Sequence, residues 1–115
     1  MQLNTMSGIF YVEFAASNRD AGAGLAVIDN GRVNGGDATY LYRGRVDHYA
    51  GDARATIEVT HYRGQPNSVM GPLRQFTLIL SGRATEDRFE FEGGTSSAPG
   101  IRIRMVGQKV APLFE

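Results

Sequence analysis

The chain has 115 residues, too few for more than one ordinary domain, and its 12 Lys and Arg residues balance its 12 Asp and Glu residues. Acidic and basic residues are interleaved, so the charge pattern predicts neither a nucleic-acid-binding surface nor attraction to a membrane. The chain has no cysteine, which excludes disulfides, thiolate catalysis and cysteine-ligated zinc.

The N-terminal segment "MQLNTMSG" lacks the basic start and the apolar run of a secretion signal. No later stretch has the ~20 apolar residues that a membrane-spanning helix needs. We therefore expect a cytoplasmic protein that forms one β-barrel domain over residues 1–115. Within it, residues 1–7 are expected to be a frayed extension before the first strand.

Strict alternation of apolar and polar residues begins at Gly8 and predicts a strand with one buried face. Its expected inward residues are Phe10, Val12 and Phe14. A second strand is predicted over residues 22–29, where small residues allow a neighbour to approach closely. Asn30-Gly31 follows and predicts a tight hairpin, because a type I′ turn needs positive φ at both central residues.

After this hairpin the sequence predicts a short returning strand over residues 32–34 and then a second turn or bulge at "GGD". We expect Gly35 and Gly36 to supply positive φ there, and Asp37 to accept hydrogen bonds from nearby backbone amides. The next strand, residues 38–46, should direct Tyr40, Tyr42 and Val46 inward. Gly44 within it predicts a bend or bulge.

Four further amphipathic strands are predicted over residues 53–62, 74–82, 87–93 and 101–107. No segment has a sustained helical period, apart from a possible helical turn over residues 68–72. About eight antiparallel strands can form either a sandwich or a barrel. The short connections favour an all-β, up-and-down barrel, whose interior holds packed side chains or one small ligand.

Residue types that carry catalysis are sparse and poorly placed. His48 lies in a predicted loop and His61 on an apolar strand face, so we expect no metal site. The serines lack a nucleophile-elbow context. Glu90 and Glu92 alternate with phenylalanines, which is typical of an amphipathic strand, and we expect them to face Arg102 and Arg104 in a cross-strand charge ladder. These patterns predict no catalytic residue and no cofactor.

Several apolar side chains fall on faces that are otherwise polar. Tyr11, Leu41 and Tyr62 are expected to point outward, and together they would form an apolar patch of the kind found in dimer interfaces. A loop that covers the same residues would explain them equally well.

The first third of the chain resembles the GrlR-type negative regulators of type III secretion, which are small bacterial cytosolic proteins. The family pattern is a strand with Gly-x-Tyr/Phe, a glycine-rich strand ending in Asn-Gly, then Gly-Gly-Asp, and then a strand ending in Tyr-x-Gly. The matching residues are Gly8, Phe10, Gly24, Asn30, Gly31, Gly35, Gly36, Asp37, Tyr42 and Gly44. The next strand extends the match weakly, and the second half of the chain matches in strand rhythm.

The resemblance implies a lipocalin-like barrel that forms a homodimer and acts by binding a protein, without catalysis. The best-known members carry an acidic Glu-Asp-Glu-Asp stretch that captures a transcriptional activator. The corresponding segment here is "DHYAGDA", which holds only two carboxylates. The expected partner-binding loop consists of Asp47, His48, Tyr49 and Asp52.

Two alternatives to a protein-binding regulator remain open at this point. In the first, the barrel binds a small molecule at a mouth lined by Tyr40, Tyr42, His61 and Phe89. A cavity of ~300 Å³ or more with a few convergent polar groups would favour it, and a filled interior would exclude it. In the second, the protein is an enzyme that depends on His61.

Overall fold

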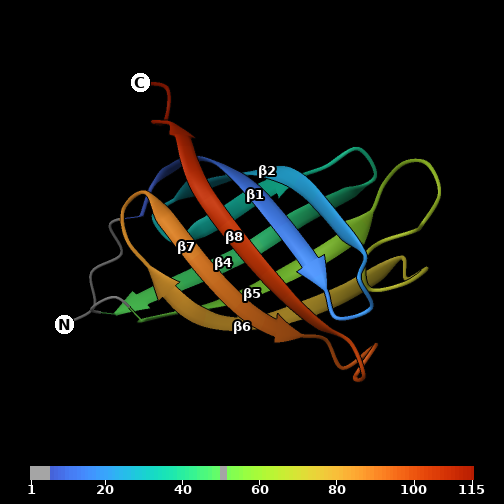
Figure 1. Cartoon of the computed structure of the whole chain (residues 1–115). Coiled ribbons are helices and arrows are strands. Elements are labelled where there is room, and N and C mark those ends of the chain that lie inside the picture. Colours follow the sequence, from blue (N-terminus) through green and yellow to red (C-terminus); the bar gives the residue numbers. More distant parts are fainter. Residues whose placement is uncertain (1–5, 50–51) are drawn as a thin grey trace.

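The structure, a computed structural model, describes residues 6–49 and 52–115 (Figure 1). In this part of the chain eight antiparallel strands form one closed barrel, and β8 pairs with β1. The strands are β1 (Gly8–Ala16), β2 (Ala21–Asp29), β3 (Arg32–Gly36), β4 (Tyr40–Tyr49), β5 (Asp52–His61), β6 (Gln75–Ala84), β7 (Arg88–Gly94) and β8 (Arg102–Ala111). The predicted all-β barrel is confirmed, and the sandwich is excluded.

Each strand pairs with its neighbours in the chain, so the order is up and down without a crossover. β5 and β6 alternate between buried and exposed residues along most of their length, as their sequences predict. The buried side chains form a single cluster inside the barrel. Burial of this apolar surface, at roughly 25 cal/mol per Å², is the main force that holds the barrel closed.

The hairpin between β2 and β3 has the predicted geometry. Asp29 and Arg32 pair directly across it, which leaves Asn30 and Gly31 as the two turn residues. Their φ angles are 53° and 80°, so both residues occupy the left-handed region that a type I′ turn requires.

The two glycines after this hairpin have a different role from the predicted one. Gly35 and Gly36 lie at the end of β3 and do not adopt positive φ, so that expectation was wrong. They are needed because a neighbouring strand comes too close for a side chain. A Cβ atom on Gly35 would lie 2.1 Å from the carbonyl oxygen of Leu25.

Gly44 likewise permits close approach and does not form a bulge. The register of β4 with β3 and with β5 is continuous through Gly44. A Cβ atom there would lie 1.9 Å from the carbonyl oxygen of Thr56, so a side chain would force the two strands apart. Inward-facing glycines of this kind allow strands to coil tightly around a small barrel.

The structure differs from the sequence prediction in two segments, the one around residues 47–52 and the one before β1. Asp47, His48 and Tyr49 belong to β4 and Asp52 begins β5, so the segment expected to be a loop is mostly strand. Met6, which we expected within a frayed extension, is fully buried in the core, whereas residues 1–5 lie outside the described part of the chain.

No helix in the described ranges is long and apolar enough to cross a membrane. The segment over residues 68–72, where a helical turn was possible, instead forms a tight turn with a bridge between Ser68 and Gly71.

Candidate functional site

The interior of the barrel is not completely filled. A cavity of about 280 Å³ lies inside the barrel, and it is bounded by inward-facing side chains from all eight strands and by residues 37–39 and 67–70, whose loops at one end of the barrel form its mouth. Most of the wall is apolar, with Val12, Ala26, Ile57, Leu78 and Ile103 among its members. The volume lies just below the ~300 Å³ at which small-molecule sites usually begin, and well above the ~150 Å³ of a cavity that holds benzene.

Three of the four residues that we expected to line a ligand site lie on this wall. Tyr40, Tyr42 and Phe89 border the cavity, but His61 does not. His61 is the last residue of β5, and it contacts the loop over residues 62–74 that follows it. Its Nε2 atom lies 2.7 Å from the carbonyl oxygen of Gly64, and its ring packs edge-on against Tyr40 at 5.5 Å between centroids.

Tyr40 joins the cavity wall to the loop above it. Its ring is buried, and its hydroxyl donates a hydrogen bond of 2.6 Å to the carbonyl oxygen of Leu73. Burial raises the pKa of the Tyr40 hydroxyl above its usual value. The contact holds the loop in place beside the cavity mouth.

The carboxylate of Asp37 lies at the mouth of the cavity. Its Oδ1 atom accepts hydrogen bonds from the backbone amides of Thr39 at 2.9 Å and Tyr40 at 2.8 Å, as the sequence predicted. Its Oδ2 atom accepts a hydrogen bond from the Tyr42 hydroxyl. Burial, together with the hydrogen bond to the Asp37 carboxylate and its charge, raises the pKa of Tyr42.

Sequence reasoning missed the contact between Asp37 and Tyr42. Both residues were singled out, one as a turn former and the other as an inward strand residue. The available signal was their spacing. Tyr42 follows Asp37 by five residues, and the tight turn between them brings β4 back alongside Asp37. Whether the two side chains meet depends on the conformation of the chain between them, which the spacing alone does not determine.

A cluster of phenylalanines borders the cavity. The ring of Phe89 stacks on Phe91 at 4.8 Å between centroids and packs against Phe10 at 5.6 Å. Its ring also covers the backbone of Gly107, where a Cβ atom would lie 2.1 Å from the ring. Gly107 thus makes room for the ring of Phe89, which fills the barrel beside the cavity.

The outer surface carries a contiguous apolar row. Tyr11 of β1 pairs directly with Leu25 of β2, Leu25 pairs with Gly36 of β3, and Gly36 pairs with Leu41 of β4. Tyr11 is 44% exposed, Leu25 50% and Leu41 38%. Sequence reasoning predicted Tyr11 and Leu41 but missed Leu25, because the small residues around it obscure the alternation of β2.

Tyr62 stands near this row and is 49% exposed. Its hydroxyl donates a hydrogen bond of 2.7 Å to the backbone carbonyl of Asp37, and its amide donates to the carbonyl of Thr39. Tyr62 therefore covers the turn between β3 and β4. Of the residues named for a dimer face, Tyr11 lies on β1, Leu41 lies on β4, two strands beyond β2, and Tyr62 directly follows β5.

The residues expected to form a partner-binding loop lie at the end of the β4–β5 hairpin where Tyr49 pairs with Asp52, away from the end where Tyr40 pairs with His61. Asp47 is exposed and lies opposite Arg54, and Asp52 is exposed and lies opposite Arg83. His48 is 8% exposed and belongs to the interior, which corrects its assignment to a loop. The side chain of Tyr49 and residues 50–51 lie outside the described part of the structure.

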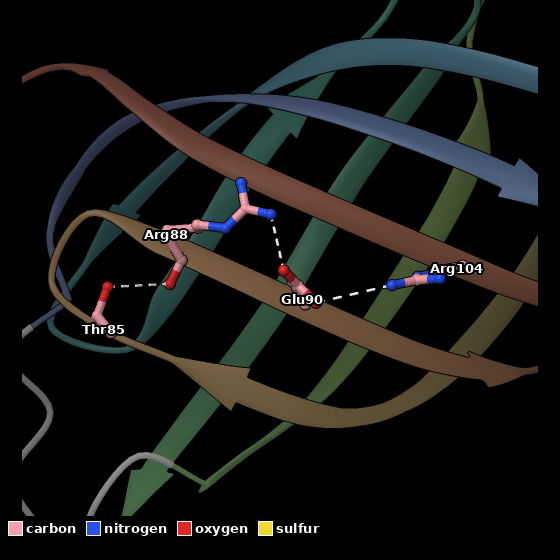
Figure 2. Close-up of polar contacts among 4 residues, drawn as sticks. All are labelled: Thr85, Arg88, Glu90 and Arg104. Carbon is pink, nitrogen blue, oxygen red and sulfur yellow. Dashed lines mark hydrogen bonds and ion pairs between the residues drawn. The ribbon is translucent and has the colours of Figure 1, made fainter.

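Glu90 of β7 forms part of a surface charge ladder with Arg88 and Arg104 (Figure 2). Arg88 Nη2 lies 2.7 Å from Glu90 Oε2, and Arg104 Nη2 lies 3.7 Å from Glu90 Oε1. The hydrogen bond from Arg88 and its charge lower the pKa of the Glu90 carboxyl. In the register Glu92 lies opposite Arg104, whereas Arg102 lies opposite Gly94.

All three side chains of this ladder are about half exposed or more, as its location on the outside of the barrel requires. Thr85, at the turn into β7, donates from its hydroxyl to the carbonyl oxygen of Arg88 (Figure 2). The cluster is thus a solvated cross-strand contact. Residues 6–49 and 52–115 contain no group of three or more His, Asp or Glu side chains arranged to hold a metal ion.

Comparison with known proteins gives one informative match. No curated protein matches the sequence. The family model described as "T3SS negative regulator, GrlR" matches residues 5–113, which include all eight strands of the barrel. The match extends far beyond the glycine-rich first third that carries the sequence resemblance, and the chain therefore belongs to the GrlR family of negative regulators of type III secretion.

Proposed function

We propose that this protein acts in the cytoplasm as a negative regulator that binds another protein and catalyses no reaction. The observation that carries the proposal is the family match over residues 5–113. The surface supports it, because β1, β2 and β4 carry exposed apolar side chains that the strand register aligns, with Gly36 of β3 between Leu25 and Leu41. Apolar patches of this kind on small domains commonly belong to protein interfaces.

The apolar row Tyr11, Leu25 and Leu41, with Tyr62 beside it, is our candidate for the homodimer face. A second copy of the chain would bury these side chains symmetrically, since a two-fold interface uses the same patch on both subunits. Some exposed apolar side chains elsewhere on the strands have polar neighbours. Ile79 on β6, for instance, is 60% exposed but lies between the polar residues Thr77 and Ser81 of the same face.

The end of the β4–β5 hairpin is our candidate for the contact with the regulated protein, which we take to be a transcriptional regulator. The resemblance assigns the acidic capture segment of the family to this position. Asp47 and Asp52 are exposed there, although each lies opposite an arginine. The contact would therefore depend less on net negative charge than in family members that carry four consecutive acidic residues.

Transcription of type III secretion genes tests the proposal. A strain without this chain should show raised reporter expression, and the wild-type chain should restore repression. The double variant Asp47→Asn, Asp52→Asn should restore it less well, whereas Glu13→Gln, an exposed acid on β1, should act like the wild type. Equal repression by both variants would exclude the hairpin as the contact, and no effect of the chain would overturn the regulatory role.

The cavity favours a second candidate function, the binding of a small apolar molecule inside the barrel. A protein that acted through its outer surface alone would not need an unfilled interior, and close packing of the core is the usual state of a small domain. The open end of the cavity gives a route of entry. This function and the first are compatible, because they use opposite sides of the same strands.

A further inference from the structure

We infer that Asp37 determines the charge of the molecule that the cavity accepts: a neutral or cationic amphiphile with a hydrogen-bond donor at its head, and not an anionic lipid or fatty acid. The inference rests on the second candidate function. It comes from the position of a carboxylate at the mouth of an otherwise apolar cavity, where the head of an amphiphile would lie.

The hydrogen bonds at the mouth leave acceptors available and few donors. The Oδ1 atom of Asp37 is occupied by backbone amides, but its Oδ2 atom accepts from the Tyr42 hydroxyl alone and has capacity for a second donor. The hydroxyl of Thr39 already donates to Asp37, and that of Ser68 already donates to the carbonyl oxygen of Gly71. The side-chain amide of Asn67, an exposed residue that also borders the cavity, is an uncharged donor. A hydrogen-bond donor on the ligand would therefore find an acceptor in the carboxylate of Asp37. A carboxylate on the ligand would instead lie beside a second acceptor of the same charge.

The charge of Asp37 is not neutralised by a cation. In the described residues no Lys, Arg or His side chain forms an ion pair with its carboxylate. Arg19, Arg63 and Arg74 occur in the loops at this end of the barrel, but none of them lines the cavity. In a cavity wall of low polarity, a fixed negative charge interacts with a nearby ligand charge more strongly than it would in water.

The volume limits the size of the ligand. At the packing density of protein interiors, about 0.74, a molecule of roughly 200 Å³ would fill the cavity of about 280 Å³. This corresponds to a single chain or one or two rings, and it excludes lipids with two full acyl chains. Alanines on the wall, Ala26 and Ala55, leave the space that such a ligand would occupy.

Isothermal titration calorimetry with three ligands of matched length tests the inference: decylammonium, decanol and decanoate, each below its micelle concentration, at pH 7. The wild-type protein should bind decylammonium and decanol at least about tenfold more tightly than decanoate. Asp37→Asn retains an oxygen acceptor but removes the charge, and it should reduce the difference between decylammonium and decanoate to less than about threefold.

Ala55→Leu provides the control for location, because it fills the cavity without altering Asp37, and it should weaken all three ligands together. Circular dichroism establishes that each variant is folded. Failure of the wild type to bind any of the three would overturn ligand binding and with it this inference. A different result would overturn only the role of Asp37: Ala55→Leu abolishes binding, but the wild type binds decanoate as tightly as decylammonium or more tightly.

Discussion

At the scale of single residues, the hydrogen bond between Tyr42 and Asp37 shows how the barrel keeps polar groups inside an apolar wall. The phenol body of Tyr42 lines the cavity, while its hydroxyl reaches the one carboxylate at the mouth. Sequence alternation predicted that Tyr42 points inward. It did not predict the partner, because alternation says which face a strand residue occupies but not where the side chain of a turn residue lies.

The raised pKa of Tyr42 predicts how stability changes in alkali. The unfolded chain loses the proton of this tyrosine near pH 10, whereas the folded protein retains it to higher pH. Stability from this group is therefore complete below pH 10 and is lost as pH rises, by at most about 1.4 kcal/mol per pH unit. Tyr42→Phe should show a smaller loss between pH 9.5 and 11.

Urea unfolding at a series of pH values measures this difference. Tyr11→Phe, on the outer surface, serves as the control and should follow the wild-type curve. At pH 7 the Tyr42→Phe variant should be less stable by about 0.5–1.5 kcal/mol, because Asp37 loses one donor. Parallel curves for wild type and Tyr42→Phe above pH 10 would contradict the buried, hydrogen-bonded hydroxyl.

At the scale of single elements, the strands follow directly from alternation, whereas their ends and curvature do not. Predicted and observed strands agree along the centres of β1, β5, β6 and β7. The β4–β5 hairpin extends further than predicted, because "DHYAGD" has the composition of a loop but its backbone continues the ladder to Tyr49 and Asp52. Cross-strand hydrogen bonds, which the local sequence does not encode, decided this boundary.

Gly44 gives an element-scale prediction about the coiling of β4. Gly44→Ala would place a Cβ atom 1.9 Å from the Thr56 carbonyl oxygen and 2.9 Å from the Ile57 Cα, both of them backbone atoms. We expect a loss of stability of about 1–3 kcal/mol or more in chemical denaturation. Gly100→Ala, with no atom within 4 Å of the new Cβ, should change stability by less than about 0.5 kcal/mol.

At the scale of the whole molecule, closure of the barrel sorts the side chains into an inner and an outer surface, each of which carries one candidate site. Inward residues of all strands meet around one cavity, and outward residues of β1, β2 and β4 meet in one apolar row. β8 completes the barrel by pairing with β1, so no sheet edge remains open between them (Figure 1). Open edges promote strand-to-strand association, and the proposed dimer therefore depends on side chains.

The proposed dimer face predicts a change in oligomeric state. Leu25→Asp introduces a charge at the centre of the row, where the side chain is 50% exposed, and should convert the dimer to a monomer without unfolding the barrel. Ile79→Asp, at a 60% exposed position on β6, should remain dimeric. Light scattering at high micromolar concentration distinguishes the two. A monomeric wild type would remove the dimer from the proposal.

The sequence alone determined the class of fold, the approximate number of strands and the type I′ hairpin at Asn30-Gly31. These features depend on local patterns, namely a two-residue period and the backbone freedom of particular turn residues. The tertiary structure decided which side chains meet across the barrel: the contact of Tyr42 with Asp37, the position of Leu25 between Tyr11 and Leu41, and the exclusion of His61 from the cavity wall. Such contacts depend on strand register, coiling and closure, which only the assembled sheet determines.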